Sequence, residues 1–354
     1  MGMRRYDVDS IKVIALGLLI VYHCLVGFQA WGPLIGFIGN EQHLEGLWIV
    51  FELLNIWRIP ILFVVSGMGV SFAMQRRNWK ELLKDRTYRI LVPYIFGFFL
   101  INPIFSIFFQ IYYEKPLWYV PNPGHLWFLL NIFFYVLLLF PVFIYFKNNP
   151  NNFFIQILSK IIKKPLGVMI LFGFPIMVEA ILINPKGYSA FVFEPIHGPL
   201  MGLICFFIGF VSISLGDKFW EQVKNVKWLC VFIAIIFYLI RIFLFRDSDS
   251  FPKFLVNLLT SFEATNWMLA AFGFSATFLN KPSKTLSYLS VAVYPVYIVH
   301  LPLQNYLASL IFGIDLPAII KFILLVFATF LVSFVLFEII RRIKKFRFFF
   351  GMKP

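Results

Sequence analysis

Residues 7–23 read Asp-Val-Asp-Ser-Ile-Lys-Val-Ile-Ala-Leu-Gly-Leu-Leu-Ile-Val-Tyr-His, a stretch apolar enough to enter a bilayer that still carries Asp9, Lys12 and His23. An α-helix advances about 100° and about 1.5 Å per residue, so Lys12 and His23 fall on nearly the same face, about 16 Å apart. A charged group inside a membrane helix is costly unless it faces protein or water. The stretch therefore predicts a membrane helix with a polar stripe and a buried site around which the other segments assemble.

The composition is typical of a polytopic membrane protein. Hydrophobic residues make up 60% of the 354 and charged residues 14%, whereas soluble domains have about 45–50% and about 25%. The cysteines Cys24, Cys205 and Cys230 lie within apolar segments and form no CxxC pattern. We therefore expect no disulfide framework, no metal and no resident cofactor.

The apolar segments predict an all-α transmembrane bundle of about ten spans, because one span needs about 20 mostly apolar residues. We expect one transmembrane domain over residues 1–345 and a short basic cytoplasmic tail over residues 346–354. The ten segments cover residues 10–30, 46–74, 90–111, 126–146, 166–183, 199–215, 228–245, 254–279, 286–312 and 318–340.

The positions of Lys and Arg predict the orientation in the membrane. The predicted loops on the side of the N-terminus hold 23 of the 31, and those on the other side hold five. Cytoplasmic loops retain such residues, so we expect both termini in the cytoplasm of a multi-pass protein of the inner (plasma) membrane. The same asymmetry accounts for the net charge of +14 without a nucleic-acid partner.

Counting residues along the predicted spans places seven ionisable groups between the middle and the outer surface of the membrane. Two explanations stay open at this stage: a functional site, or a buried network of ion pairs. The seven groups are His23, Arg58, His125, Glu179, Arg241, Glu263 and His300.

Arg86 and Arg89 stand at the predicted cytoplasmic start of the third span. Their i,i+3 spacing puts both on one helix face, where guanidinium groups can bind a phosphorylated ligand by forked hydrogen bonds. From the residues alone, simple positive-inside anchoring is the favoured alternative.

His23 has the chemistry that acyl transfer needs, because an imidazole can take a proton from a hydroxyl and return one near neutral pH. Lys12 either stabilises negative charge or pairs with Asp9, three residues earlier. The chain contains no GxSxG elbow, no Walker loop and no HExxH motif.

Four stretches, in this order, resemble the acyltransferase family 3 of integral membrane proteins, and a fifth near the end also fits. The first is Lys12 with His23 after ten intervening residues, which matches the family's Arg/Lys-x10-His signature. The others are Arg58-Ile-Pro-Ile-Leu-Phe-Val-Val-Ser66-Gly67, Arg86-x-x-Arg89 before Leu91-Val-Pro93, His125-Leu-Trp127-Phe128-Leu129, and Tyr294-Pro-Val-Tyr297-Ile-Val-His300.

The family transfers acyl groups to extracytoplasmic sugars and glycans. The resemblance implies that His23 is essential for transfer and that Arg86 and Arg89 engage an acyl-CoA donor from the cytoplasm. Lys12 stands at the position of the signature's cation and is the second predicted catalytic residue, with a point charge in place of a forked guanidinium. The resemblance also implies substrate contacts in its other motifs, at Arg58, His125, Trp127 and His300.

Within the family, the chain looks most like the branch of glucan biosynthesis protein C, whose members attach succinyl groups to periplasmic glucans. We therefore expect an O-acyltransferase that moves an acetyl or succinyl type of group from acyl-CoA to a glycan or glycolipid. A transporter or flippase for an anionic or lipid-linked glycan is the alternative. No inverted repeat or matched pair of Gly/Pro breaks favours it. A structural membrane subunit without chemistry is a third reading.

Overall fold

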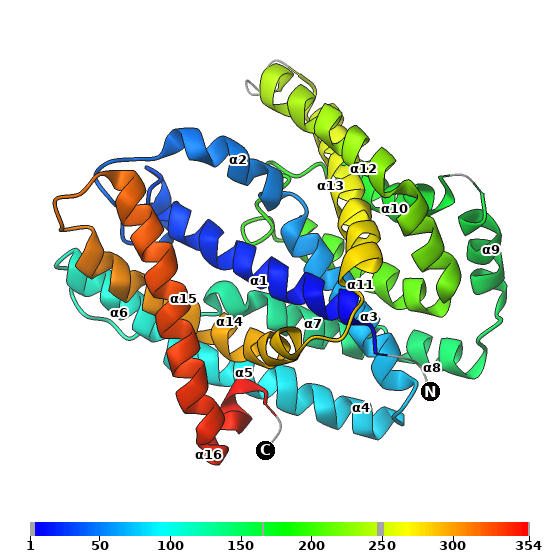
Figure 1. The fold of residues 1–354 in the computed structure, drawn as a ribbon, viewed down its shortest axis with the longest axis horizontal. Coiled ribbons are helices and arrows are strands. Elements are labelled where there is room, and N and C mark those ends of the chain that lie inside the picture. Colours follow the sequence, from blue (N-terminus) through cyan, green and yellow to red (C-terminus); the bar gives the residue numbers. More distant parts are fainter. Residues whose placement is uncertain (1–3, 165, 246–250, 353–354) are drawn as a thin grey trace. The chain divides into compact units, whose positions relative to one another are not determined.

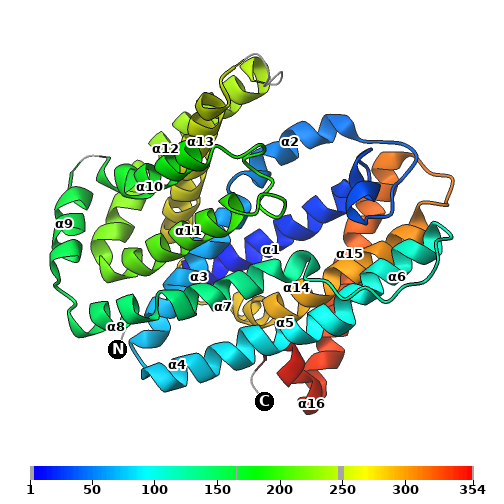
Figure 2. The same ribbon diagram turned by 180° about the vertical axis from the view of Figure 1, so that it is seen from behind.

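The computed structural model describes residues 4–164, 166–245 and 251–352, and in these it contains helices and no strand. Figures 1 and 2 show the chain from two opposite sides. It forms two compact units, which are described separately. Unit 1 comprises the residues up to Lys12, then 52–82 and 134–286. Unit 2 comprises 13–51, 83–133 and the residues from Ser287 on. Arg246 and Lys353, which the charge distribution assigns to loops, lie outside the described residues.

The unit boundaries fall inside five helices, so these helices contribute to both units. The five are α1 (Tyr6–Val26), α2 (Glu45–Asn55), α4 (Trp79–Arg86), α7 (Trp127–Leu138) and α14 (Lys284–Ile311). Unit 1 further contains α3 (Arg58–Met74), α8 (Phe140–Asn148), α9 (Phe153–Ile162), α10 (Gly167–Ile183), α11 (His197–Ser214), α12 (Asp217–Leu244) and α13 (Lys253–Phe274). Unit 2 further contains α5 (Val92–Phe96), α6 (Asn102–Tyr112), α15 (Ala318–Arg342) and α16 (Lys344–Arg347).

All ten predicted spans fall on helices, so the all-α prediction is confirmed. Among the described residues, seven helical segments are long and apolar enough to cross a membrane, and nine if two bent pairs each count as one. The chain is therefore a multi-pass membrane protein. α13 fails this test because it carries polar residues such as Thr260, Glu263 and Asn266, which are buried. The count of ten and the side of the termini stay predictions.

Two glycines set the close crossing of α3 and α11 in unit 1. A Cβ atom on Gly67 would collide with the carbonyl of Phe206, and one on Gly209 would collide with the carbonyl of Val64. Small residues let membrane helices approach to backbone contact, where packing stabilises the pair. In the same unit α12 and α13 lie side by side along most of their length (Figure 1).

The core of unit 2 is built on the second half of α1. Ile20 and Cys24 are buried there in one cluster with Val296 of α14 and Leu325 of α15. Their four-residue spacing places both on one apolar face of α1, as expected for a helix inside a bundle. His23 precedes Cys24, so this packing also fixes the turn of α1 that carries the predicted catalytic residue.

The third predicted span is an α-helix interrupted twice by π-helical turns. These turns cover Thr87–Leu91 and Gly97–Ile101, between α4, α5 and α6. Pro93 and Pro103 follow the two turns and lack the N–H that a regular helix would use. A π turn holds more residues than an α turn and is often found at functional sites. Arg89 lies in the first of them.

Candidate active site

Three predicted histidines meet in unit 2. His23 lies near the end of α1, His300 on α14, and His125 in the 3₁₀ turn Gly124–Leu126 before α7. His23 Nδ1 lies 2.9 Å from His300 Nε2, and the two rings are parallel to within 5°. The His125 ring stands edge-on to His300, with ring centroids 4.9 Å apart. Residues separated by up to 277 positions thus form one cluster.

The backbone carbonyl of Tyr297 determines where the protons lie. Its oxygen is 2.8 Å from His300 Nδ1 and 2.8 Å from His125 Nε2. A carbonyl only accepts, so both nitrogens carry a hydrogen. With neutral rings, His300 Nε2 is then an acceptor and takes the hydrogen of His23 Nδ1. This order places the lone pair of His23 on Nε2, so Nε2 is the nitrogen of this ring that can accept a proton.

One proline frees a backbone carbonyl of α14 beside the cluster. Pro295 and Pro302 lie inside α14, and a proline removes the N–H that would bond to the carbonyl four residues earlier. Pro302 therefore leaves the carbonyl of Ile298 without its helical donor. The carbonyls of Tyr297 and Ile298 both act on the His125 ring.

His125 is held by its neighbours in the loop before α7. The Asn102 side chain donates hydrogen bonds to the carbonyls of Asn122 and Pro123, at 2.9 and 2.7 Å. Gly124 has a φ of +43°, and a Cβ there would lie 2.7 Å from the Asn102 amide nitrogen. The Tyr297 hydroxyl donates to the backbone carbonyl of His125. These contacts fix the backbone of the turn that carries the His125 ring.

His23 is held at its backbone as well as at its ring. The Gln304 side chain donates a hydrogen bond of 2.9 Å to the His23 carbonyl at the end of α1. Phe37 lies against the His23 ring, with centroids 5.8 Å apart. His300 and Gln304 are buried, whereas His23 and His125 are partly exposed. A ligand would therefore meet His23 and His125 first.

His125 Nδ1 is a further polar atom at the site. It is buried and has no hydrogen-bond partner among the described residues. Because Nε2 carries the hydrogen, Nδ1 is an acceptor, and it can take a hydrogen bond from a bound hydroxyl or amide. In the described part of the chain the histidines belong to no group of His, Cys, Asp and Glu suited to a metal ion.

The predicted phosphate-binding arginines lie in the same unit. Arg86 ends α4, and Arg89 lies in the π turn, where its Nε is 3.1 Å from Asp85 Oδ1. The wider π turn separates them more around the axis than the α-helical spacing predicts. Both guanidinium groups interact electrostatically with the phenol of Tyr294 on α14. Tyr294 precedes His300 by six residues, which is about 9 Å of helix.

The remaining predicted site residues are distributed over other helices. Lys12 pairs with Asp9 at 3.6 Å and is eleven residues from His23 on α1. Trp127 begins α7, directly after the turn that carries His125. Arg58 begins α3 in unit 1 and is only 1% exposed. Lys12 and Arg58 both belong to unit 1, and their predicted roles stay predictions.

Unit 1 contains two acid–base pairs among its helices. Arg241 of α12 binds Glu263 of α13, with a shortest distance of 2.7 Å, and Glu52 lies 3.6 Å from the same guanidinium. Glu179 of α10 contacts His197 of α11 at 2.8 Å. The seven groups expected at one level therefore divide: three form the histidine cluster, and Arg241 and Glu263 form an ion pair.

Sequence reasoning missed His197, and it missed the groups that orient the histidine cluster. His197 Nε2 lies 2.9 Å from the Tyr188 carbonyl, so both ring nitrogens of this histidine have partners. Burial raises the pKa of the Tyr188 hydroxyl well above its usual value. In unit 2, the prolines of α14 were a signal for exposed carbonyls, but nothing in the sequence pointed to Gln304 or Asn102.

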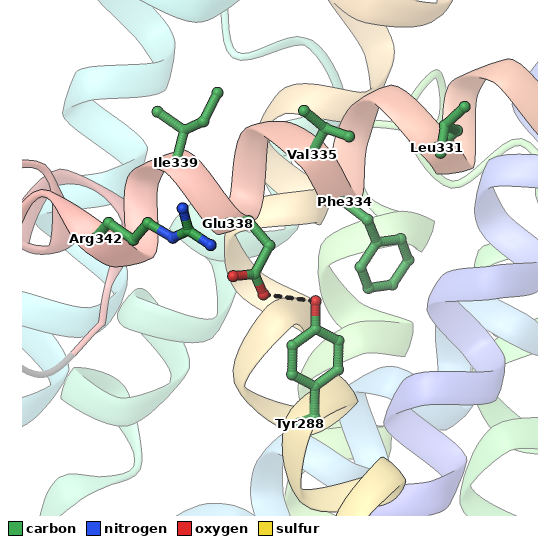
Figure 3. A pocket seen from close by; sticks show the side chains of 7 residues that line it. All are labelled: Tyr288, Leu331, Phe334, Val335, Glu338, Ile339 and Arg342. Atoms are coloured by element: carbon green, nitrogen blue, oxygen red, sulfur yellow. Dashed lines mark hydrogen bonds between the residues drawn. The ribbon is translucent and has the colours of Figure 1, made fainter.

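A groove of about 340 Å³ lies between α14 and α15 in unit 2 (Figure 3). The Tyr288 hydroxyl donates to Glu338 at 2.8 Å across it, and Arg342 stands at one end. The remaining lining is apolar and comes from Leu331, Phe334, Val335 and Ile339. The groove contains none of the residues predicted for catalysis or substrate binding, so we do not assign the active site to it.

Comparison with known families agrees with the motifs. The profile of the acyltransferase domain matches residues 5–338, which include α1 through most of α15. No curated protein and no solved structure matches the chain. The matched region contains every helix of the histidine cluster and the Arg86–Arg89 motif. The chain therefore belongs to the acyltransferase family 3, and it is a multi-pass membrane enzyme that transfers acyl groups to oxygen.

Proposed function

We propose that this enzyme moves an acetyl or succinyl type of group from cytoplasmic acyl-CoA to a hydroxyl of an extracytoplasmic glycan or glycolipid. In this proposal His23 accepts the proton, and His300 and the Tyr297 carbonyl orient it. The order of their hydrogen bonds is the observation that carries the proposal, since it assigns the lone pair of His23 to Nε2. Family membership favours this enzyme over a transporter or flippase.

The transfer starts when His23 Nε2 takes the proton of the acceptor hydroxyl. The hydroxyl oxygen bonds to the thioester carbonyl carbon, the carbon–sulfur bond breaks, and the leaving thiolate takes the proton from His23. The products are an oxygen ester and CoA with its thiol, and the ring returns to its first state. While His23 is an imidazolium, its hydrogen bond to His300 is charge-assisted and therefore stronger.

The donor side of the proposal rests on Arg86 and Arg89. Guanidinium groups bind phosphates by paired hydrogen bonds, and CoA carries phosphates at its nucleotide end. Both arginines interact electrostatically with Tyr294, and α14 continues from Tyr294 to His300. A donor held at the arginines can thus extend its arm along α14 towards the histidines.

The acceptor side uses the polar atoms at the edge of the cluster. His125 Nδ1 is suited to accept a hydrogen bond from the reacting sugar, and Trp127, beside it, offers an aromatic face. Arg58 is a further candidate for substrate contact, because a buried arginine in a membrane protein is costly to keep. Lys12, which lies 3.6 Å from Asp9, remains the second catalytic candidate of the proposal.

The direct test compares the rate of acyl transfer by the purified wild-type protein with that of the purified variant His23→Ala. We expect acyl transfer to fall by about 10²–10⁴-fold, the usual contribution of a positioned acid–base group. Thiol release from acetyl-CoA and succinyl-CoA, with a glycan acceptor present, measures the reaction and compares the two acyl groups. His43→Gln is the matched control, because His43 is exposed in unit 2 and lies outside the cluster.

Normal turnover by His23→Ala would remove His23 from the mechanism. A rapid quench without acceptor separates two routes: accumulation of an acyl-imidazole on His23 indicates a covalent intermediate, and its absence indicates direct transfer. Loss of folded protein is monitored by thermal unfolding, so that a structural effect is not counted as a catalytic one.

A further inference from the structure

Residues Lys344–Gly351, here called the aromatic segment, fold back onto the third span within unit 2. The segment consists of α16 followed by a 3₁₀ turn, Phe348–Phe350, and it ends at Gly351 with a φ of +65°. It meets the span at the π turn Thr87–Leu91 and at α5. This is the turn that contains Arg89.

The aromatic segment contacts the third span through its aromatic rings and through its backbone. Phe348 lies against Tyr88, with centroids 5.6 Å apart, and Phe350 lies against Phe96 at 5.3 Å. A Cβ on Gly351 would stand 2.8 Å from the Arg89 carbonyl oxygen. The segment therefore touches the main chain of the arginine motif itself, at a position where a side chain does not fit.

The solvent side of this contact combines aromatic rings with positive charge. Phe348 keeps 40% of its surface exposed and Tyr88 keeps 46%. Lys344, Lys345 and Arg347 are three cations within four residues and belong to the exposed or partly exposed part of the chain. Arg86, at the end of α4, and Arg89, in the π turn, add two cations. Rings that remain open beside several cations suit a ligand with both a base and phosphates.

We propose that the aromatic segment completes the donor site and binds the nucleotide end of acyl-CoA. The base stacks on the exposed rings of Tyr88 and Phe348, since nucleic-acid bases stack on aromatic side chains in a sequence-tolerant way. The cations of α16 bind the phosphates from the side opposite Arg86 and Arg89. This inference rests on the proposed function, because it takes acyl-CoA as the donor.

The alternative is that aromatic and basic residues only anchor the segment at the membrane surface. An anchor needs contact with lipid and no contact with the arginine motif. The approach of Gly351 to the Arg89 carbonyl and the ring contact with Tyr88 favour a role at the motif. The two readings differ in whether nucleotide affinity depends on the segment.

The test measures equilibrium binding of CoA and of 3′-dephospho-CoA to the full chain in nanodiscs of zwitterionic lipid at fixed salt. In the variant Lys344→Gln/Lys345→Gln/Arg347→Gln we expect CoA affinity to fall about 10²-fold and 3′-dephospho-CoA affinity to fall less, because charge-assisted hydrogen bonds to phosphate are lost. The matched control replaces the three lysines of the α9 region, Lys160, Lys163 and Lys164, by Gln.

A second pair of variants tests the ring surface. Phe348→Ala should weaken CoA binding about tenfold, and Phe348→Tyr should restore it, because tyrosine keeps the stacking face. Phe327→Ala is the control, since Phe327 is a 68% exposed ring on α15 away from the motif. Gly351→Val should weaken binding as well, through displacement of the segment from Arg89.

The outcomes separate this inference from the proposed function. If wild-type protein binds no CoA, the acyl-CoA donor itself is wrong. If wild-type protein binds CoA and Arg89→Gln weakens it, while the α16 triple variant and Phe348→Ala both bind like wild type, the donor stands and the inference is wrong. If the α16 triple variant loses the same factor in affinity for CoA and for 3′-dephospho-CoA, the cations of α16 do not bind the 3′-phosphate.

Discussion

The two units treat polar groups among membrane helices in different ways. In unit 1, acid meets base: Arg241 binds Glu263, and His197 contacts Glu179. In unit 2, His23 and His300 bind each other, and His300 binds a backbone carbonyl. In a buried ion pair each charge compensates the other, and removal of one partner destabilises the fold because it leaves an uncompensated charge. A chain of neutral imidazoles instead leaves an acceptor nitrogen at its end, which can take up a proton and release it.

This difference predicts different consequences of mutation. Removing a member of a pair in unit 1 leaves an uncompensated charge, so it should lower the free energy of unfolding and leave turnover of the folded fraction unchanged. Removing a member of the histidine chain in unit 2 leaves no buried charge, so it should lower turnover with a smaller loss of stability.

The largest effect is expected for Arg241→Ala, which leaves Glu263 buried without its main partner. We expect the free energy of unfolding to fall by about 3–5 kcal/mol. Unfolding in a mixed-micelle denaturant titration measures it. The double variant Arg241→Ala/Glu263→Ala removes both charges and should recover part of the lost stability. If its loss of stability equals the sum of the losses in the two single variants, the two side chains do not stabilise each other.

A loss of about 10²-fold in kcat is expected for His300→Ala, because His23 then loses the acceptor that assigns its proton to Nδ1. His300→Gln should recover part of the rate, since a glutamine oxygen can accept from His23 Nδ1. Steady-state kcat and the pH profile of kcat are the measurements. His197→Gln in unit 1 is the control, and an equal loss of kcat there would erase the distinction between the units.

The elements of this fold were predictable because their signal is local. Each predicted span falls on one helix or on consecutive helices, and the span 318–340 falls on α15 alone. Counting residues from the start of each span placed His23 and His300 at the same depth, and the two are in contact. Position along a helix follows from sequence number alone, so this part of the site needed no knowledge of packing.

The choice of partners was not predictable in the same way. Arg241 had Glu179 and Glu263 as possible partners at similar depth, and only the packing of α12 on α13 decides for Glu263. The π turn around Arg89 depends on how the prolines and neighbouring helices distort the backbone. The Tyr297 carbonyl is a backbone group, and the letters of a sequence do not show which carbonyls are accessible. Pro302 was a signal only for the neighbouring carbonyl of Ile298.

The smallest expected effect concerns a hydrogen bond from a tyrosine hydroxyl to a backbone carbonyl, which occurs in both units. The Tyr297 hydroxyl donates to the His125 carbonyl in unit 2, and the Tyr135 hydroxyl donates to the Pro199 carbonyl at 2.6 Å in unit 1. Tyr→Phe at either position removes one neutral hydrogen bond, so we expect each to lower the free energy of unfolding by about 0.5–1.5 kcal/mol.

Their effects on catalysis should differ. Tyr297→Phe keeps the backbone carbonyl that orders the histidine protons, so kcat should fall less than about tenfold, through looser placement of His125. Tyr135→Phe should leave kcat unchanged. Unfolding and kcat measured on both variants decide the matter. If Tyr297→Phe lowers kcat as much as His300→Ala, the hydroxyl rather than the carbonyl orders the cluster, and the assignment of the lone pair to His23 Nε2 fails.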